Sequence, residues 1–143
     1  MSLLNIQNLS VTLGDPLFSD LTLTLSKGDR LGLVAANGRG KTTLLSCISG
    51  TFEHTSGDIT RARNLRVGHV AQYVSDADLT TTLYDKVLSA LPEEHVDFES
   101  WRVDVALDEL SVPYELQQQQ LGTLSGGWQR TALLASAWVT QPD

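Results

Sequence analysis

The segment from Ala35 to Leu45, AANGRGKTTLL, places two glycines, a lysine and two threonines at the start of a helix-like apolar pattern. Glycine lets the backbone approach an anion closely, so that consecutive N–H groups form a concave nest. Lys41 would reach the β- and γ-phosphates of a nucleotide, and the Thr42 hydroxyl would ligate Mg²⁺. The helix start adds its partial positive charge. The residues expected to hold this polyphosphate are Asn37, Gly38, Arg39, Gly40, Lys41, Thr42 and Thr43.

This loop departs from the full phosphate-binding pattern G-x-x-x-x-G-K-[ST] at its first position, where the chain has Ala35. Alanine is tolerated there if its φ is negative, and a positive φ would cost on the order of 1 kcal/mol or more. A glycine-rich turn that only caps a helix is the alternative interpretation. The apolar run before the loop and the helical pattern after it favour the phosphate-binding loop (P-loop).

A second serine-glycine-glycine step opens another apolar, helix-like run, LSGGWQRTALLASAWV. The Ser125 hydroxyl and the amides of Gly126 and Gly127 would lie at a helix N-terminus, where backbone N–H groups favour anions. One chain therefore carries two predicted sites for phosphate groups.

Periodicity predicts the elements that must position these residues. Residues 3–13 and 17–29 alternate apolar with polar side chains, which favours two antiparallel strands joined through Gly14-Asp15-Pro16. Residues 30–35 form a short apolar run typical of a strand buried on both faces. Helical spacing follows in Leu44, Leu45 and Ile48, and Gly50 is the expected stop.

The pattern changes along the second half of the chain. Residues 56–74 predict two short strands around an arginine-containing turn, whereas 81–91 and 101–110 carry helix-type apolar stripes before Pro92 and Pro113. We therefore expect an α/β fold with a P-loop core and β-rich part in residues 1–75. A helical part is expected in 76–124 and a final helix in 125–143.

Composition limits the possible functions. Residues 1–75 carry seven Lys/Arg and five Asp/Glu, and residues 76–143 carry three and twelve, which together give the net charge of −7. The acidic second half argues against its tracking a nucleic-acid backbone. One cysteine, Cys47, forms no internal disulfide and is expected as a small buried side chain. With no apolar run near 18 residues, we expect a cytoplasmic chain that does not itself insert in a membrane.

The two motifs in this order resemble the ATP-binding cassette (ABC) ATPases, and the resemblance covers nearly all of the chain. It implies a P-loop NTPase with a helical signature subdomain that binds ATP and Mg²⁺. It also implies a second cassette, packed head to tail, whose ATP contacts the signature residues. Gln72 would be the Q-loop residue that senses Mg²⁺ and the γ-phosphate. The signature residues implied are Ser125, Gly126, Gly127 and Gln129.

Trp128 stands where many cassettes have glutamine. This variant, with WRVDVALDEL upstream and no membrane-spanning segment, most resembles the soluble ABC-F type, in which many members act on ribosomes. We therefore expect an ABC-F-like ATPase. The alternatives are the ATP-binding subunit of a membrane transporter with a membrane-domain partner, and an interaction module that binds nucleotide without turnover.

The family's catalytic Asp-Glu pair follows an apolar strand after a Pro-Asp step, and its switch histidine comes later. This chain ends at Pro142-Asp143, so we expect an N-terminal portion of a cassette whose catalytic residues are absent and whose isolated hydrolysis is negligible. The histidines and carboxylates present are expected in a linker or on solvated surfaces: His54, His69, His95, Asp76, Asp78, Glu93, Glu94 and Glu99.

Several other side chains leave alternatives open. Leu13 or Phe18 corresponds to the aromatic that often covers adenine in the family, so selectivity for ATP over GTP is open. Trp128 either packs inward or borders the partner's nucleotide. A solvated hairpin face or RNA contacts are expected for Arg61, Arg63 and Arg66, and core positions for Trp101 and Trp138.

Overall fold

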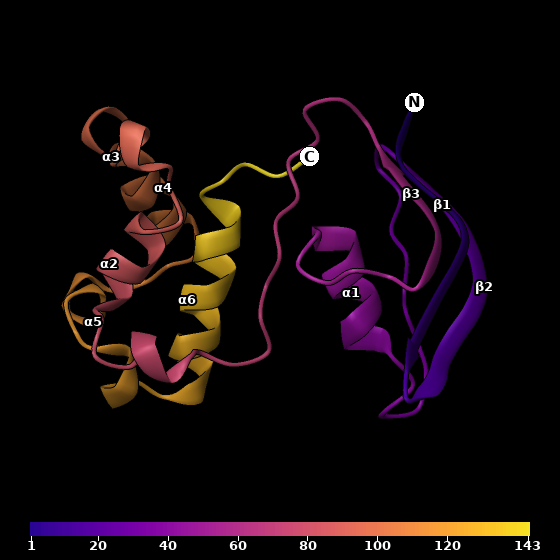
Figure 1. The fold of residues 1–143 in the computed structure, drawn as a ribbon. Helices are drawn as coiled ribbons and strands as arrows, with labels where there is room; N and C mark the ends of the chain where they lie inside the picture. The colour runs from indigo at the N-terminus through magenta and orange to yellow at the C-terminus, as the bar shows by residue number, and fades with distance from the viewer. The chain divides into compact units, whose positions relative to one another are not determined.

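The computed structural model describes residues 1–143. They divide into two compact units, Met1–Val67 with Asp143, and Gly68–Pro142. Figure 1 shows the strands of the first unit and the helices of the second. Each unit has an apolar core of its own. No helix in either unit has the length and apolar character required to cross a membrane.

The first unit is built on an antiparallel sheet with the strand order β2-β1-β3. β1 spans Ser2–Leu13, β2 spans Asp15–Ser26 and β3 spans Ser56–Arg61. The predicted antiparallel pairing of the first two strands is confirmed. β3 forms the other neighbour of β1 and was the first of the two strands expected in residues 56–74.

A bulge in β1 keeps its apolar side chains on one face. Leu4, Ile6, Leu9 and Val11 are all buried. In a regular strand, the even-numbered pair and the odd-numbered pair would point to opposite faces of the sheet. Asn8, with a φ of 49°, absorbs the extra residue between them, and the register with β2 shifts between Ile6 and Leu9. The strand therefore presents a continuous apolar face to the helix described next.

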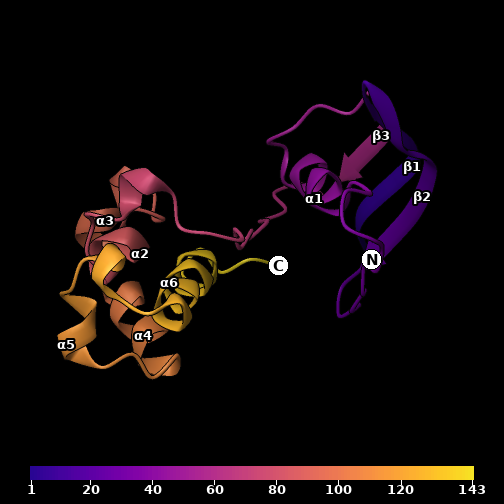
Figure 2. The same ribbon diagram turned by 90° about the horizontal axis from the view of Figure 1, so that it is seen from below.

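The helix α1, Lys41–Ser49, packs on this face of the sheet, as Figure 2 also shows. Leu44 and Ile48 contact the cluster formed by β1, and Cys47 is buried as predicted. Gly50 ends the helix in the left-handed conformation with φ 84°, and its N–H donates to the carbonyl of Cys47. The predicted helix and its glycine stop are confirmed.

Two predicted strands are absent, and those predictions were wrong. Residues 30–35 are not part of a sheet, and Leu31 and Val34 are exposed. Residues 67–74 form no strand either, with Val67, Val70 and Tyr73 exposed. A strand needs a hydrogen-bonded neighbour, and β1, β2 and β3 pair only with one another.

The second unit is helical. Its elements are η1 Asp76–Asp78, α2 Leu83–Leu88, α3 Glu93–Glu99, α4 Trp101–Glu109, α5 Tyr114–Gln117, η2 Leu121–Thr123 and α6 Gly126–Trp138. The helices predicted over 81–91 and 101–110 are confirmed as α2 and α4. The Thr82 hydroxyl caps α2 by accepting from the N–H of Asp85. The core of the unit joins α2, α4 and α6 through Leu83, Leu107 and Ala132.

Candidate nucleotide-binding site

The loop before α1 has the geometry of an anion nest. Gly38 and Gly40 have φ values of 81° and 88°, and Arg39 donates its N–H to the carbonyl of Ala36 across the turn. Gly40 caps α1 without a side chain. The first N–H groups of the helix, those of Lys41, Thr42 and Thr43, donate to no protein group. They are therefore available for phosphate oxygens.

Gly40 is required both by its backbone angle and by the space around it. A Cβ at this position would lie 3.0 Å from Cδ1 of Phe18 and 3.1 Å from Cβ of Leu17. Both neighbours come from β2, so the sheet directly supports the loop. A side chain at residue 40 would push the loop off this support.

The side chains of the loop are also placed for this role. Lys41 donates its ammonium to the carbonyl of Ala35, at the beginning of the loop. The exposed Thr42 hydroxyl takes part in no hydrogen bond. Ala35 is not among the residues with positive φ, so alanine at this first position carries no left-handed strain. This resolves the open question of the sequence in favour of an unstrained loop.

These residues fit a magnesium-bound nucleotide. Mg²⁺ prefers oxygen ligands and usually takes only one or two from the protein, with phosphates and waters supplying the rest. The Thr42 hydroxyl is such an oxygen, at the end of the nest where a phosphate would bind. No group of three or more histidine, cysteine or acidic side chains is placed to hold a metal ion by itself.

The predicted signature residues begin α6. Ser125 is the N-cap, and its hydroxyl accepts from the N–H of Trp128 at 3.4 Å. Gly126 and Gly127 are exposed, and the space beside Gly126 is open. Gln129 is engaged within the unit, because its side-chain amide donates to the carbonyls of Leu121 and Leu124, at 2.9 and 3.2 Å.

Trp128, which the sequence left undecided, is half-buried and packs against the core of the helical unit. Gln72 also belongs to the helical unit, where it is exposed and donates to the Tyr73 hydroxyl at 3.4 Å. The P-loop belongs to the other unit. The contact of Gln72 with Mg²⁺ and nucleotide therefore stays a prediction.

Arg61 has a structural role that the sequence did not reveal. Its guanidinium donates to the carbonyls of Cys47 and Ile48, both at 2.8 Å, in the last turn of α1. Arg61, Arg63 and Arg66 are all exposed, as the expected solvated face requires. The side chain of Arg63 forms no hydrogen bond, whereas Arg61 makes these contacts with α1 in addition. No local signal predicts this contact, because the arginine comes from β3 and the carbonyls come from α1.

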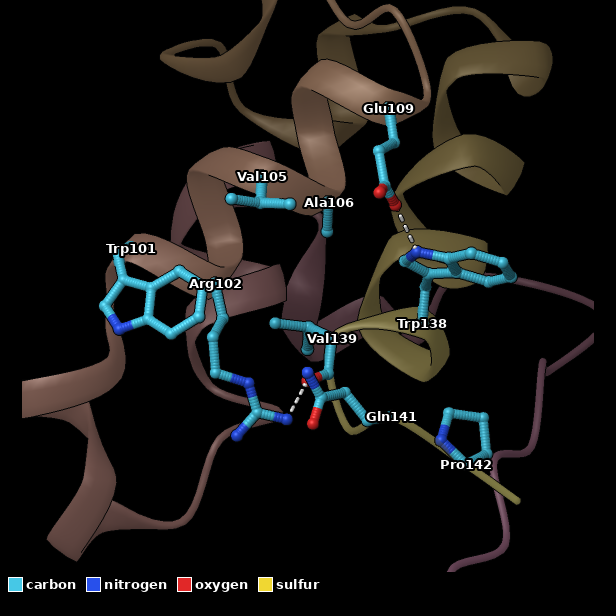
Figure 3. Close-up of a pocket in the computed structure, with 9 residues that line it drawn as sticks. All are labelled: Trp101, Arg102, Val105, Ala106, Glu109, Trp138, Val139, Gln141 and Pro142. Carbon is cyan, nitrogen blue, oxygen red and sulfur yellow. Dashed lines mark hydrogen bonds between the residues drawn. The ribbon is translucent and has the colours of Figure 1, made fainter.

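Trp101 and Trp138 do not lie in the core, so that prediction was wrong. They are 56% and 52% exposed and line a pocket of about 280 Å³ in the helical unit (Figure 3). In α4 the buried face carries Val103, Ala106 and Leu107, and Trp101 lies outside it. The indole N–H of Trp138 donates to Glu109 at 2.7 Å.

The remaining titratable candidates form local contacts. Hydrogen bonds from Lys86 and Ser75 hold the pKa of Asp78 below its usual value, and those from Arg102 and His95 lower the pKa of Glu99. His54 contacts the carbonyl of Gly57. None of these groups forms a hydrogen bond or ion pair with the P-loop. Asp76, His69, Glu93 and Glu94 are exposed, as expected.

A P-loop helix on an antiparallel sheet, with a helical unit whose last helix starts at Ser-Gly-Gly, defines an ATP-binding cassette of the P-loop NTPase class. Residues 18–143 match the family described as ABC transporter, and the chain therefore belongs to this family of ATPases. The expected fold class is confirmed.

Individual relatives support the same assignment. The zinc import ATP-binding protein ZnuC of Cereibacter sphaeroides is 34% identical over 144 residues, which cover 100% of this chain and 57% of the relative. The ATP-binding protein Uup of Buchnera aphidicola is 28% identical over 145 residues, covering 24% of its length. The chain spans a little over half the length of the ZnuC proteins that it matches.

A solved structure shows the same fold. A metal-chelate type ABC transporter in an inward-facing conformation superposes with a TM-score of 0.82 and 28% identity, over 99% of this chain and 58% of the other. The expected ABC-F type is not specifically supported, because the ZnuC proteins of Cereibacter sphaeroides and Chromohalobacter salexigens are 34% and 36% identical over the full chain, whereas Uup of Buchnera aphidicola is 28% identical.

Proposed function

We propose that the chain binds Mg-ATP as the nucleotide-binding part of an ABC transporter. The observation that carries this proposal is the nest at the start of α1, where three unpaired N–H groups follow two left-handed glycines. Phosphate oxygens would satisfy these groups and would meet the positive end of the helix dipole. Lys41 would exchange the Ala35 carbonyl for the β- and γ-phosphates.

Bound Mg²⁺ would neutralise charge on the β- and γ-phosphates, with the Thr42 hydroxyl as its protein ligand. Gln72 would contact the ion and the γ-phosphate from the helical unit. Ser125, Gly126 and Gly127 would face the nucleotide of a second cassette, for which their exposure at the start of α6 leaves them free. Gln129 would act indirectly, since its amide holds the turn that precedes Ser125.

The transporter alternative is better supported than an ABC-F role on ribosomes. The zinc import names of the relatives and the metal-chelate transporter structure support a membrane-domain partner and a metal ion or metal chelate as cargo. Trp128, the residue that suggested ABC-F, is half-buried and packs against the core of its own unit. The presence of tryptophan at position 128 is therefore explained by packing within this unit, whichever partner the chain has.

Titration calorimetry with Mg-ATP tests the proposal. Lys41→Ala should weaken binding by about tenfold or more, because a charged hydrogen-bond donor to phosphate is lost. Thr42→Val should weaken Mg-ATP binding and reduce the effect of removing Mg²⁺ with a chelator. Lys27→Ala, which removes the same charge from an exposed turn, is the matched control. Equal affinity of the Lys41→Ala variant and the native chain would refute the assignment.

A further inference from the structure

The P-loop contains the one asparagine of the chain that precedes a glycine. Asn5, Asn8 and Asn64 are followed by isoleucine or leucine, whereas Asn37 is followed by Gly38. Asparagine is a thermolabile residue, because the backbone nitrogen of the next residue can attack the carbon of its side-chain amide. A side chain on that next residue hinders the attack, and glycine has none. The sequence therefore concentrates this reactivity in the loop that is expected to hold phosphate.

Few contacts hold the turn that contains Asn37. The N–H of Arg39 donates to the carbonyl of Ala36 at 3.3 Å, and Gly38 has a φ of 81°, which together define a type II turn. The side chain of Asn37 forms no hydrogen bond, and the N–H of Gly38 donates to no protein group. Both residues are exposed. Apart from the adjoining residues, no atom lies within 4 Å of the position of a Cβ on Gly38, so nothing packs against the turn.

One peptide plane must rotate before the reaction can take place. In a type II turn, the peptide between Asn37 and Gly38 directs its nitrogen away from the side chain of Asn37. Rotation toward the type I arrangement brings this nitrogen to the amide carbon and changes φ at residue 38 from positive to negative. Because glycine adopts both signs of φ without strain, only the 3.3 Å hydrogen bond opposes the rotation.

We propose that Asn37 is a self-modification site, at which the empty loop converts to a form that no longer holds phosphate. The Gly38 nitrogen bonds to Cγ of Asn37, the bond from Cγ to Nδ2 breaks, and ammonia leaves with the proton of the Gly38 N–H. Water then opens the cyclic imide at one of its two carbonyls and restores that N–H. The product is an aspartyl residue, or an isoaspartyl residue whose backbone runs through Cγ. One water molecule is consumed and one ammonia is released.

Either product disrupts the phosphate site. It places a carboxylate where Asn37 is neutral, and this charge repels the oxygens of a phosphate. The isoaspartyl product also adds one atom to the backbone immediately before Gly38, so the N–H groups of the nest no longer point to one centre. The conversion is therefore a loss of binding that is encoded in the loop itself.

A bound nucleotide would protect Asn37, and this part of the proposal rests on the proposed function. A triphosphate in the nest would hold Gly38 and Gly40 in their left-handed conformations and would occupy the N–H groups at the start of α1. The peptide after Asn37 could then not rotate. A loaded loop keeps its asparagine, whereas an empty loop loses it.

Incubation in mildly alkaline buffer, which promotes loss of the Gly38 amide proton, tests the modification site. Trypsin then releases residues 31–39, in which Asn37 is the only side-chain amide. By mass spectrometry, this peptide should gain the mass of an amide replaced by a carboxylic acid and should separate into two isomers. Residues 1–27, with Asn5 and Asn8 in β1, are the internal control. Conversion of 31–39 no faster than that of 1–27 would overturn the proposal.

The same incubation with saturating Mg-ATP tests protection. Conversion of residues 31–39 should slow by about tenfold or more, because the site is then rarely empty. Calorimetry on a fresh sample shows independently whether Mg-ATP binds. Binding without protection would overturn the proposal. Absence of binding would instead refute the proposed function, and conversion in the free chain would then decide the modification site.

Calorimetry on the converted chain tests the loss of binding. The number of Mg-ATP sites per chain should fall in step with the converted fraction. Asn37→Asp, which has the sequence of one product, should bind Mg-ATP about tenfold more weakly or worse. Asn64→Asp adds the same charge at an exposed asparagine outside the loop and should bind as the native chain does. An unchanged number of sites after full conversion, or equal affinities of the two variants, would overturn the proposal.

Discussion

Arg61 shows how one side chain can hold the helix that carries the phosphate site. α1 has no basic residue in its own last turn, so the carbonyls at its negative end depend on groups from elsewhere. Arg61 supplies a fixed positive charge and two short hydrogen bonds to Cys47 and Ile48. The same helix begins at Lys41. Its C-terminus is thereby fastened to β3, while its N-terminus carries the proposed nucleotide site.

Replacing Arg61 by glutamine should destabilise the first unit by about 1–3 kcal/mol, since hydrogen bonds from a charged donor to helix carbonyls are lost. The free energy of unfolding in urea measures this. The Cys47 thiol is buried, and burial raises its pKa above the usual value. Thiol modification should therefore become faster when the Arg61 substitution makes α1 open more often. Arg63→Gln, at a position without hydrogen bonds, should leave both quantities unchanged. Equal effects of the two substitutions would contradict the role of Arg61.

The secondary structure elements divide into those that local sequence predicts and those that it does not. The alternation of β1 and β2, the stripe of α4 and the stop at Gly50 depend on neighbours a few residues away, and all are observed. Residues 30–35 have an equally apolar pattern, but a strand there depends on a partner that is distant in sequence. The periodicity of a sequence indicates which residues prefer burial, but it does not identify the strand with which they would pair.

The candidate site divides in the same way. The nest at Gly38 and Gly40 follows from residue types alone, because glycine is the residue that adopts these angles without strain. The support of Gly40 by Phe18, and the exposure of Trp138, depend on packing between separate segments. A single sequence contains no signal for such contacts.

Hydrogen exchange should distinguish the unpaired segment from the sheet. The backbone N–H groups of residues 31–35 donate to no protein group, so they should exchange orders of magnitude faster than those of β1, which lies between two strands. Mass spectrometry or NMR of the native chain measures both. Residues 67–73, which are exposed and whose backbone N–H groups donate to no protein group, serve as an internal reference for rapid exchange. Protection of residues 31–35 equal to that of β1 would contradict the unpaired arrangement.

At the scale of the whole molecule, binding and hydrolysis have different requirements. The proposed binding would use the nest, Lys41 and the Thr42 hydroxyl as metal ligand, all of which lie in one short segment. Hydrolysis also needs a group that positions the attacking water and stabilises the developing charge. No carboxylate among residues 1–143 forms a hydrogen bond or ion pair with the P-loop, and none follows an apolar strand in the way that the family implies.

A polypeptide of residues 1–143 should therefore bind Mg-ATP and release phosphate at a rate indistinguishable from the rate without protein. A coupled phosphate assay under saturating Mg-ATP measures this, with binding confirmed on the same sample. Lys41→Ala identifies any contaminating ATPase, because contamination survives the substitution. Turnover that the native chain shows and that this variant lacks would prove the prediction wrong.

Arg66 and Asp143 lie 77 positions apart, yet the N–H of Arg66 donates to the Asp143 carboxylate at 2.8 Å, and the N–H of Asp143 donates to the Arg66 carbonyl at 3.0 Å. The chain thus leaves the first unit at Val67 and rejoins it at a directly neighbouring residue. Topologically, residues 68–142 form an insertion whose two ends meet, the arrangement in which inserted domains are most readily exchanged. A few glycines and serines should bridge the same junction, and production of the first unit joined in this way would test whether the sheet and α1 fold without residues 68–142.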